Sequence, residues 1–164
     1  MACLGVHFVL TDVDVATLRD LETDDARLGY VGDVIEQREL KGPGAAESDK
    51  AWDAMHRALS GGELTLEGGE YPLNHVVLGG EMLYDGEDYL MSLKTPTEVA
   101  DIARAIGGLD ERDFRRRYDA IGADYDGDLG DEDFAYTWRS FQVVRRLYLR
   151  AADSGHHVLF TADQ

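Results

Sequence analysis

Residues Ser48–Gly62 read SDKAWDAMHRALSGG, and this stretch contains the signals that decide the fold. Ser48 or Asp49 can accept hydrogen bonds from the free N–H groups of a first helical turn, and Gly61-Gly62 can end the last turn. Between these ends, four side chains recur at positions that share one helical face: Trp52, Met55, His56 and Leu59. We therefore predict a central helix here, around which the rest of the chain packs.

Length and composition favour one globular domain over residues 1–164. A chain of 164 residues is about one domain by the usual size range, and its 44% apolar content argues against wholesale disorder. No stretch approaches the roughly 20 apolar residues that a membrane span needs. The apolar N-terminus lacks a basic segment and a small-residue cleavage site, so we expect a cytoplasmic protein.

The charge balance narrows the class of partner. Sixteen Lys and Arg residues face 33 Asp and Glu residues, which gives a formal net charge of −17. Binding to nucleic acid or to an anionic membrane needs a basic surface, so this balance disfavours both. It permits attraction to a basic protein partner, although an acidic surface can also serve solubility alone. Abundant Arg, Gly, Ala and Asp are typical of a bacterial genome rich in GC.

Hydrophobic periodicity predicts the remaining elements. Strands are expected over Cys3–Thr11, Tyr89–Lys94 and His156–Ala162. Helices are expected after Asp12, over about Asp25–Glu39, from Thr95 to Ile106, from Asp110 to about Ile121, and from Asp131 to about Asp153. The clearest start is Thr95-Pro96-Thr97-Glu98, where Thr95 fits an N-cap and Glu98 completes a capping box. Loops are expected at Lys41–Glu47, Glu63–Tyr71, Glu81–Glu87 and Gly122–Asp133. Pro72–Gly80 is expected to form a short helical turn or a buried segment that ends in glycines.

Three segments carry a resemblance to a known family: DKAWDAMHRALSG (Asp49–Gly61), PLNHVVLGGEMLYDG (Pro72–Gly86) and YLMSLKTPTEVADIARAI (Tyr89–Ile106). With the helix-to-strand ending at Leu147–Phe160, they resemble the YfbM-like family, small bacterial proteins classed as a domain of unknown function. The most specific part is the pattern D-K-x-W-D-x-x-H-x-x-L-[ST]-G within the first segment. The resemblance implies an α+β fold, with a small mixed β-sheet packed against several helices. It supplies no activity and no site residue.

The candidate site is formed by Trp52, Asp53 and His56 on the central helix. Trp52 could present a flat wall of a pocket, and His56 could donate, accept or shuttle a proton. Asp53 lies three residues before His56, so a carboxylate–imidazole pair on one helix is feasible. The alternative is that His56 is a hydrogen-bonded core histidine and that Asp53 is a local salt-bridge partner. The orientation of His56 distinguishes these two interpretations.

Other chemical signals are weaker, and none predicts a metal or a cofactor. His7, His156 and His157 lie on the first and last strands, but they offer too few ligands for a structural metal. The acidic run Asp124–Asp133 has Leu129 and Ala135 where a calcium-binding EF-hand loop needs Gly and Glu, so we expect a solvated loop. Cys3 has no basic neighbour that would activate a thiolate. Neither a phosphate-binding loop, nor a dinucleotide fingerprint, nor a nucleophile elbow is visible.

Two functional hypotheses follow. The first is a non-catalytic acidic binding module that docks a basic protein partner, for which toxin neutralisation by immunity proteins is a precedent. The second is a small-ligand binder or enzyme with a pocket around Trp52, Asp53 and His56. Arginines along one face of the last long helix could recognise an anion or could neutralise neighbouring carboxylates.

Overall fold

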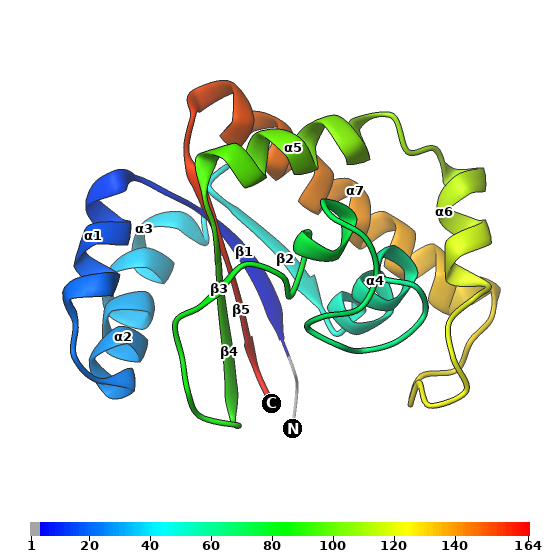
Figure 1. Cartoon of the computed structure of the whole chain (residues 1–164), viewed down its shortest axis with the longest axis horizontal. Coiled ribbons are helices and arrows are strands. Elements are labelled where there is room, and N and C mark those ends of the chain that lie inside the picture. The colour runs from blue at the N-terminus through cyan, green and yellow to red at the C-terminus, as the bar shows by residue number, and fades with distance from the viewer. Residues whose placement is uncertain (1–3) are drawn as a thin grey trace.

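The computed structural model describes residues 4–164, whose helices surround a five-stranded β-sheet (Figure 1). The strand order is β2-β1-β5-β4-β3, and each neighbouring pair is antiparallel. The strands are β1 (Gly5–Leu10), β2 (Ala45–Asp49), β3 (Glu81–Met82), β4 (Tyr89–Lys94) and β5 (His157–Asp163). The α-helices are α1 (Asp12–Asp20), α2 (Asp24–Tyr30), α3 (Gln37–Glu39), α4 (Ala51–Leu59), α5 (Pro96–Gly107), α6 (Glu111–Tyr118) and α7 (Asp131–Ser154). The predicted α+β class is confirmed.

Helices cover both faces of the sheet, and each face has its own apolar cluster. In β1, Phe8 and Leu10 belong to the cluster beneath α1 and α2, whereas Val9 packs against the larger cluster beneath α4, α5 and α7. This division follows from the alternation of side chains along a strand. The π-helix η1 (Val31–Glu36) joins α2 to α3, so the helix predicted over about Asp25–Glu39 forms as one continuous helical stretch.

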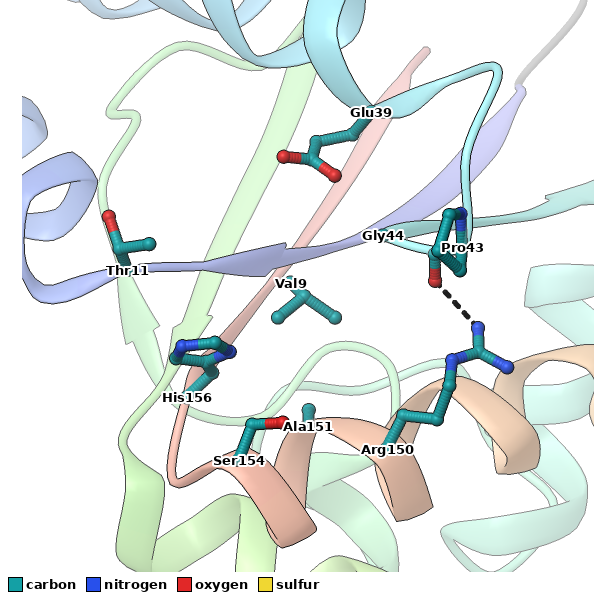
Figure 2. Close-up of a pocket in the computed structure, with 9 residues that line it drawn as sticks. All are labelled: Val9, Thr11, Glu39, Pro43, Gly44, Arg150, Ala151, Ser154 and His156. Atoms are coloured by element: carbon teal, nitrogen blue, oxygen red, sulfur yellow. Dashed lines mark hydrogen bonds between the residues drawn. The ribbon is translucent and has the colours of Figure 1, made fainter.

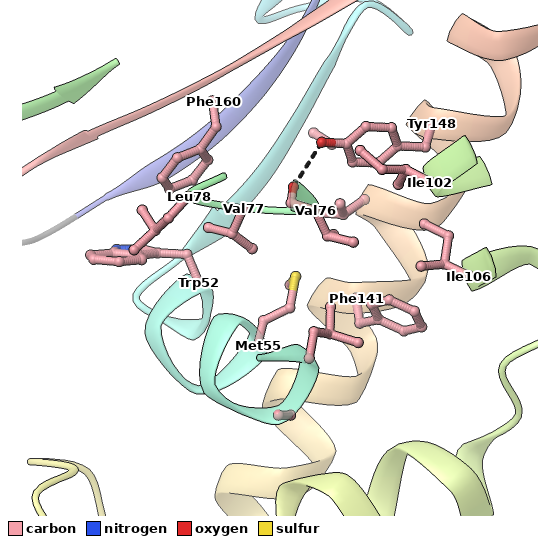
Figure 3. Close-up of a cluster of buried hydrophobic side chains, with 14 of the residues drawn as sticks. Trp52, Met55, Val76, Val77, Leu78, Ile102, Ile106, Phe141, Tyr148 and Phe160 are labelled. Atoms are coloured by element: carbon pink, nitrogen blue, oxygen red, sulfur yellow. Dashed lines mark hydrogen bonds between the residues drawn. The ribbon is translucent and has the colours of Figure 1, made fainter. Parts of the chain in front are cut away.

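Helix α4 lies at the centre of the larger cluster. All of its residues except Asp53 are buried. Figure 3 shows Trp52 and Met55 pointing from α4 towards Phe160 of β5, Phe141 of α7 and the irregular segment that follows residue 75. Full burial of each large apolar side chain contributes about 1.5–3 kcal/mol. The predicted role of this helix as a packing centre is confirmed.

The start of α4 differs from the prediction. Ser48 and Asp49 end strand β2, and the N-cap position is Lys50, which makes no side-chain capping bond. The Ser48 hydroxyl donates instead to the Gly5 carbonyl at 3.1 Å, which joins β2 to β1. A cap at Ser48 or Asp49 is therefore wrong, and so is a loop that extends through Glu47. The local Gly-Pro-Gly signal is real, but the pairing that makes residues 45–49 a strand is made with distant residues in β1.

Two further details of the prediction need correction. The described strands pair antiparallel throughout, so the sheet is not mixed. The segment Glu81–Glu87 begins with the short strand β3, which pairs with β4, before it continues as a loop. Both errors concern pairing between segments, which hydrophobic periodicity within one segment does not encode.

Local helix signals are confirmed where they were strongest. The Thr95 hydroxyl accepts from the Glu98 N–H, and the Glu98 carboxylate accepts from the Thr95 N–H, so the capping box is complete. Helix α7 ends at Gly155, which has the left-handed conformation with φ of 67°. The N-terminal strand forms from Gly5 onward, and Cys3 lies outside the described residues.

Gly5 is a position where β1 and α4 approach closely. A Cβ atom built at Gly5 would lie 2.6 Å from the Trp52 ring, and Trp52 is held by Phe160 at a ring-centroid separation of 5.7 Å. We expect Gly5→Ala to lower the free energy of unfolding by about 1–3 kcal/mol, because it overpacks this contact. Urea denaturation measures the change.

Gly29→Ala in α2 is the matched control, because nothing lies within 4 Å of the Cβ that it adds. We expect this variant to be more stable than the native protein by about 0.4–1 kcal/mol, since alanine restricts the unfolded chain. Equal effects of the two substitutions would contradict the close approach of β1 and α4.

Candidate functional site

A cavity of about 650 Å³ opens beside the first turn of α4. Its walls come from the end of β2, from α4, from the loop between α6 and α7, and from the first turns of α7. The lining residues are Asp49, Lys50, Trp52, Asp53, Tyr125, Asp126, Gly127, Asp133 and Tyr136. Three aromatic side chains and four carboxylates therefore share this cavity with one ammonium group.

Hydrogen bonds hold the aromatic and acidic groups of the cavity together. The Tyr136 hydroxyl donates to Asp49 at 2.7 Å, and the Tyr125 hydroxyl lies 3.3 Å from Asp133. The Tyr118 hydroxyl, from the end of α6, donates to the same Asp133 carboxylate at 2.6 Å. Burial and this carboxylate raise the pKa of Tyr118 to about 12, and burial and Asp133 also raise the pKa of Tyr125. Both phenols therefore stay protonated as donors at neutral pH.

Asp49 also has an unusual backbone conformation, with φ of 46°. Positive φ is uncommon outside glycine, and Asp is one of the residues that tolerate it best. This conformation turns the chain from β2 into α4 within one residue, Lys50. The turn places the Asp49 carboxylate and the Trp52 ring on the same cavity.

Arg57 fixes the acidic loop to α4. Its side chain is 5% exposed. The guanidinium donates to Asp53 at 2.6 Å and to Asp124 at 2.9 Å, and it lies 5.6 Å from the centroid of the Tyr125 ring. A buried cation that is paired on two sides holds its partners in place. The loop predicted as a solvated acidic run is therefore anchored at Asp124 and Tyr125, while Asp126 has no hydrogen bond or ion pair with any described residue.

The three candidate residues from the sequence analysis do not all lie at the cavity. Trp52 and Asp53 line the cavity, but His56 is fully buried and is not among the lining residues. The His56 Nε2 donates to the Thr65 carbonyl at 2.7 Å, and Asp53 pairs with Arg57. His56 thus ties the 63–70 excursion to α4, and the carboxylate–imidazole pair is not formed.

His56 and His7 are both held in their neutral form. His7 Nε2 donates to the Val76 carbonyl at 2.8 Å, and the Nδ1 atom of each ring is buried without a hydrogen-bond partner. Burial is the main cause that lowers the pKa of His7 from 6.5 to about 3 and that of His56 from 6.5 to about 4. These rings act as structural donors to backbone carbonyls.

The remaining histidines do not converge. His157 Nε2 lies 3.0 Å from Asp12, on the face of the sheet opposite to His7. In residues 4–164, no group of three or more His, Cys, Asp or Glu side chains is placed to hold a metal ion. Among the same residues, no helix is long and apolar enough to cross a bilayer.

The sequence matches the family model described as Domain of unknown function (DUF1877) over residues 1–161. The chain belongs to this family. Protein YfbM of Escherichia coli (strain K12) is 26% identical over 129 residues, which cover 73% of this chain and 77% of YfbM. The crystal structure of YfbM from Escherichia coli, titled a protein of unknown function, matches with a TM-score of 0.70 at 19% identity. It covers 97% of this chain and 99% of YfbM.

The YfbM-like resemblance of the sequence is thus confirmed, and the structural match shows the fold alone. The family description assigns no activity, so the chemistry has to come from the cavity. Sequence reasoning missed Asp49, Tyr125, Asp126, Asp133 and Tyr136 as cavity residues. One signal was present: Tyr125 is an aromatic residue inside an otherwise acidic, glycine-bearing loop, where a solvated loop gains nothing from a large ring.

The neutral histidines generate a pH prediction. Below pH 6.5, the unfolded chain takes up protons that His7 and His56 cannot accept in the folded protein. Their contribution to stability is therefore complete above pH 6.5 and is lost as the pH falls towards 4 for His56 and towards 3 for His7. Each ring adds a slope that approaches roughly 1.4 kcal/mol per pH unit.

His56→Gln isolates one of these contributions, since a glutamine amide can still donate to the Thr65 carbonyl. We expect urea denaturation between pH 7.5 and 4.5 to give a shallower loss of stability for this variant than for the native protein. Other titrating groups contribute equally to both proteins, so their contributions to the pH dependence cancel in the comparison. One such group is Glu36, whose pKa is raised by burial and by Asp163. Parallel pH profiles of the two proteins would contradict a neutral, buried His56.

Proposed function

We propose that this protein is a non-catalytic binding module that docks a basic protein partner by taking an arginine or lysine side chain into the cavity beside α4. The observation that supports this proposal is the convergence of Trp52, Tyr125 and Tyr136 with four carboxylates on one cavity. Aromatic faces attract cations, and desolvated cation–π contacts contribute up to about 2 kcal/mol. Carboxylates add charge-assisted hydrogen bonds to the same cationic group.

The protein already contains an interaction of this kind. Arg57 reaches the Tyr125 ring from the α4 side while it pairs with Asp53 and Asp124. Asp126 lies on the exposed rim and has no partner among the described residues, so its charge is available to an incoming cation. Within residues 4–164, Lys50 is the one positively charged residue that lines the cavity. Its ammonium group repels an incoming cation, so the partner has to displace this group or bind away from it.

The overall charge supports the same class of partner. A net charge of −17 draws a basic protein towards the surface and raises its association rate at low salt. The aromatic rings then supply specificity that diffuse charge does not. The second hypothesis of the sequence analysis needs His56 at the cavity, and the ring is instead enclosed beneath the 63–70 excursion.

The test uses Nα-acetyl-L-arginine amide as the probe and the matching citrulline derivative as its neutral counterpart. We expect arginine to shift the amide resonances of Tyr125, Asp126 and Gly127 in a two-dimensional NMR titration. Citrulline should bind at least tenfold more weakly, because it keeps the shape of the side chain and lacks its charge. Added salt should weaken the arginine complex.

Asp126→Asn should weaken arginine binding several-fold, and Tyr136→Leu should do the same by removing a ring. Asp128→Asn is the matched control, because Asp128 is exposed on the same loop but does not line the cavity. Equal effects of Asp126→Asn and Asp128→Asn would show that arginine senses net charge and not this cavity. Equal binding of arginine and citrulline would overturn the proposal.

A further inference from the structure

A second cavity, of about 270 Å³, lies at the other end of α7. The residues that line it include Val9, Glu39, Arg150, Ala151, Ser154 and His156. With a rise of 1.5 Å per residue, Arg150 lies about 20 Å along α7 from Tyr136 of the first cavity. The two cavities share no residue, so ligand binding at one does not depend on the proposed function of the other.

The cavity has an apolar floor with opposite charges on its rim. Figure 2 shows Val9 between the Glu39 side chain, which comes from α3, and the Arg150 side chain, which comes from α7. Ala151 lies on the α7 side, and His156 stands on a third side, just before β5. A concave apolar surface with a few convergent polar groups is the usual form of a small-molecule site.

Arg150 retains donors for a ligand. One of its Nη atoms donates to the Pro43 carbonyl at 2.6 Å, which positions the guanidinium at the rim. A guanidinium has five N–H donors, and Arg150 forms no ion pair with a described carboxylate although the chain carries 33 acidic residues. The residues of α7 from Phe134 to Ala152 contain no Asp or Glu. Asp153, three residues further along α7, is the acidic residue of this helix nearest to Arg150 in sequence, and no ion pair joins the two side chains.

Glu39 is held on the opposite side of the cavity. Arg38 donates to its Oε1 at 2.5 Å, and its Oε2 occupies the space that a side chain at Gly44 would fill, 1.8 Å from an ideal Cβ. The glycine thus allows the carboxylate to lie against the backbone at the rim. The imidazole ring of His156 forms no hydrogen bond with a described residue, and neither does the hydroxyl of Ser154. Both groups are therefore free to contact a ligand.

We propose that this cavity binds a small zwitterion of the amino-acid class. The ligand carboxylate would pair with Arg150, assisted by the Ser154 hydroxyl and the His156 ring, and the ligand ammonium would pair with Glu39. The short apolar part of the ligand would lie on Val9 and Ala151. Guanidinium groups match carboxylates in a bidentate geometry, and the apolar floor favours a small aliphatic ligand.

The experiment titrates the full chain with L-valine and with γ-aminobutyrate, which separate the same two charges by different lengths. The single-charge analogues are isovalerate and isobutylamine for valine, and butyrate and propylamine for γ-aminobutyrate. We expect at least one zwitterion to shift the amide resonances of Val9, Gly44 and His156. Its two analogues should each bind at least tenfold more weakly.

Variants test each end of the ligand. Arg150→Gln should weaken the bound zwitterion and its carboxylate analogue, whereas Glu39→Gln should weaken the zwitterion and leave the carboxylate analogue unchanged. Arg146→Gln is the matched control, because it removes the same charge from an exposed position of α7 outside the cavity. Far-ultraviolet circular dichroism confirms that each variant is folded.

Three results would overturn the proposal. The first is the absence of shifts with both zwitterions. The second is equal binding of a zwitterion and its carboxylate analogue, which would make the cavity an anion site. The third is an equal loss of binding in Arg146→Gln and Arg150→Gln, which would show a general charge effect. None of these results bears on arginine binding at the first cavity.

Discussion

The fold depends on hydrogen bonds from side chains to four buried backbone carbonyl groups in the irregular segment Val76–Gly79. This segment crosses the larger apolar cluster, and Val76, Val77 and Leu78 are almost completely buried. An unpaired buried carbonyl costs about 1–3 kcal/mol, so each needs a donor. The donors are side chains from three elements. His7 of β1 and Tyr148 of α7 both donate to the Val76 carbonyl. Lys94 of β4 donates to the Val77 carbonyl. The hydroxyl of Ser92, also in β4, lies within hydrogen-bond distance of the Leu78 and Gly79 carbonyls.

This arrangement explains why titratable side chains stand in the core: they donate hydrogen bonds to the carbonyl groups of the crossing segment. Lys94 is fully buried, its Nζ also donates to the Ser92 hydroxyl at 2.8 Å, and burial lowers its pKa well below 10.5. The same burial raises the pKa of Tyr148 well above 10 and keeps it a donor to the Val76 carbonyl. His7, Lys94 and Tyr148 are thus polar ties between the sheet, α7 and the crossing segment. Polar networks of this kind specify one packing arrangement because every alternative leaves buried groups unpaired.

The sequence predicts the elements better than their assembly. The capping box at Thr95, the glycine after α7 and the periodicity of α4 are local signals, and local structure follows them. The strand at residues 45–49 has no comparable signal, because it exists through pairing with β1. Trp52 and Asp53 were identified from one helix, but their partners Tyr125 and Tyr136 come from a loop and a helix more than seventy residues away in sequence. The hydrophobic periodicity of a single segment does not predict contacts between segments that are distant in sequence.

The two polar residues of the W-D-x-x-H pattern are separated by their partners. Asp53 and His56 are three residues apart and therefore only about 60° apart around the axis of α4, but Asp53 pairs with Arg57 and His56 bonds to the Thr65 carbonyl. Asp53 takes the exposed side, where Arg57, one turn further on, pairs with it and reaches the acidic loop. His56 takes the side covered by the 63–70 excursion and fixes it through the Thr65 carbonyl. One short helix therefore supports a cavity through one side and closes the core through the other. Changes at His56 should therefore act on the stability of the fold.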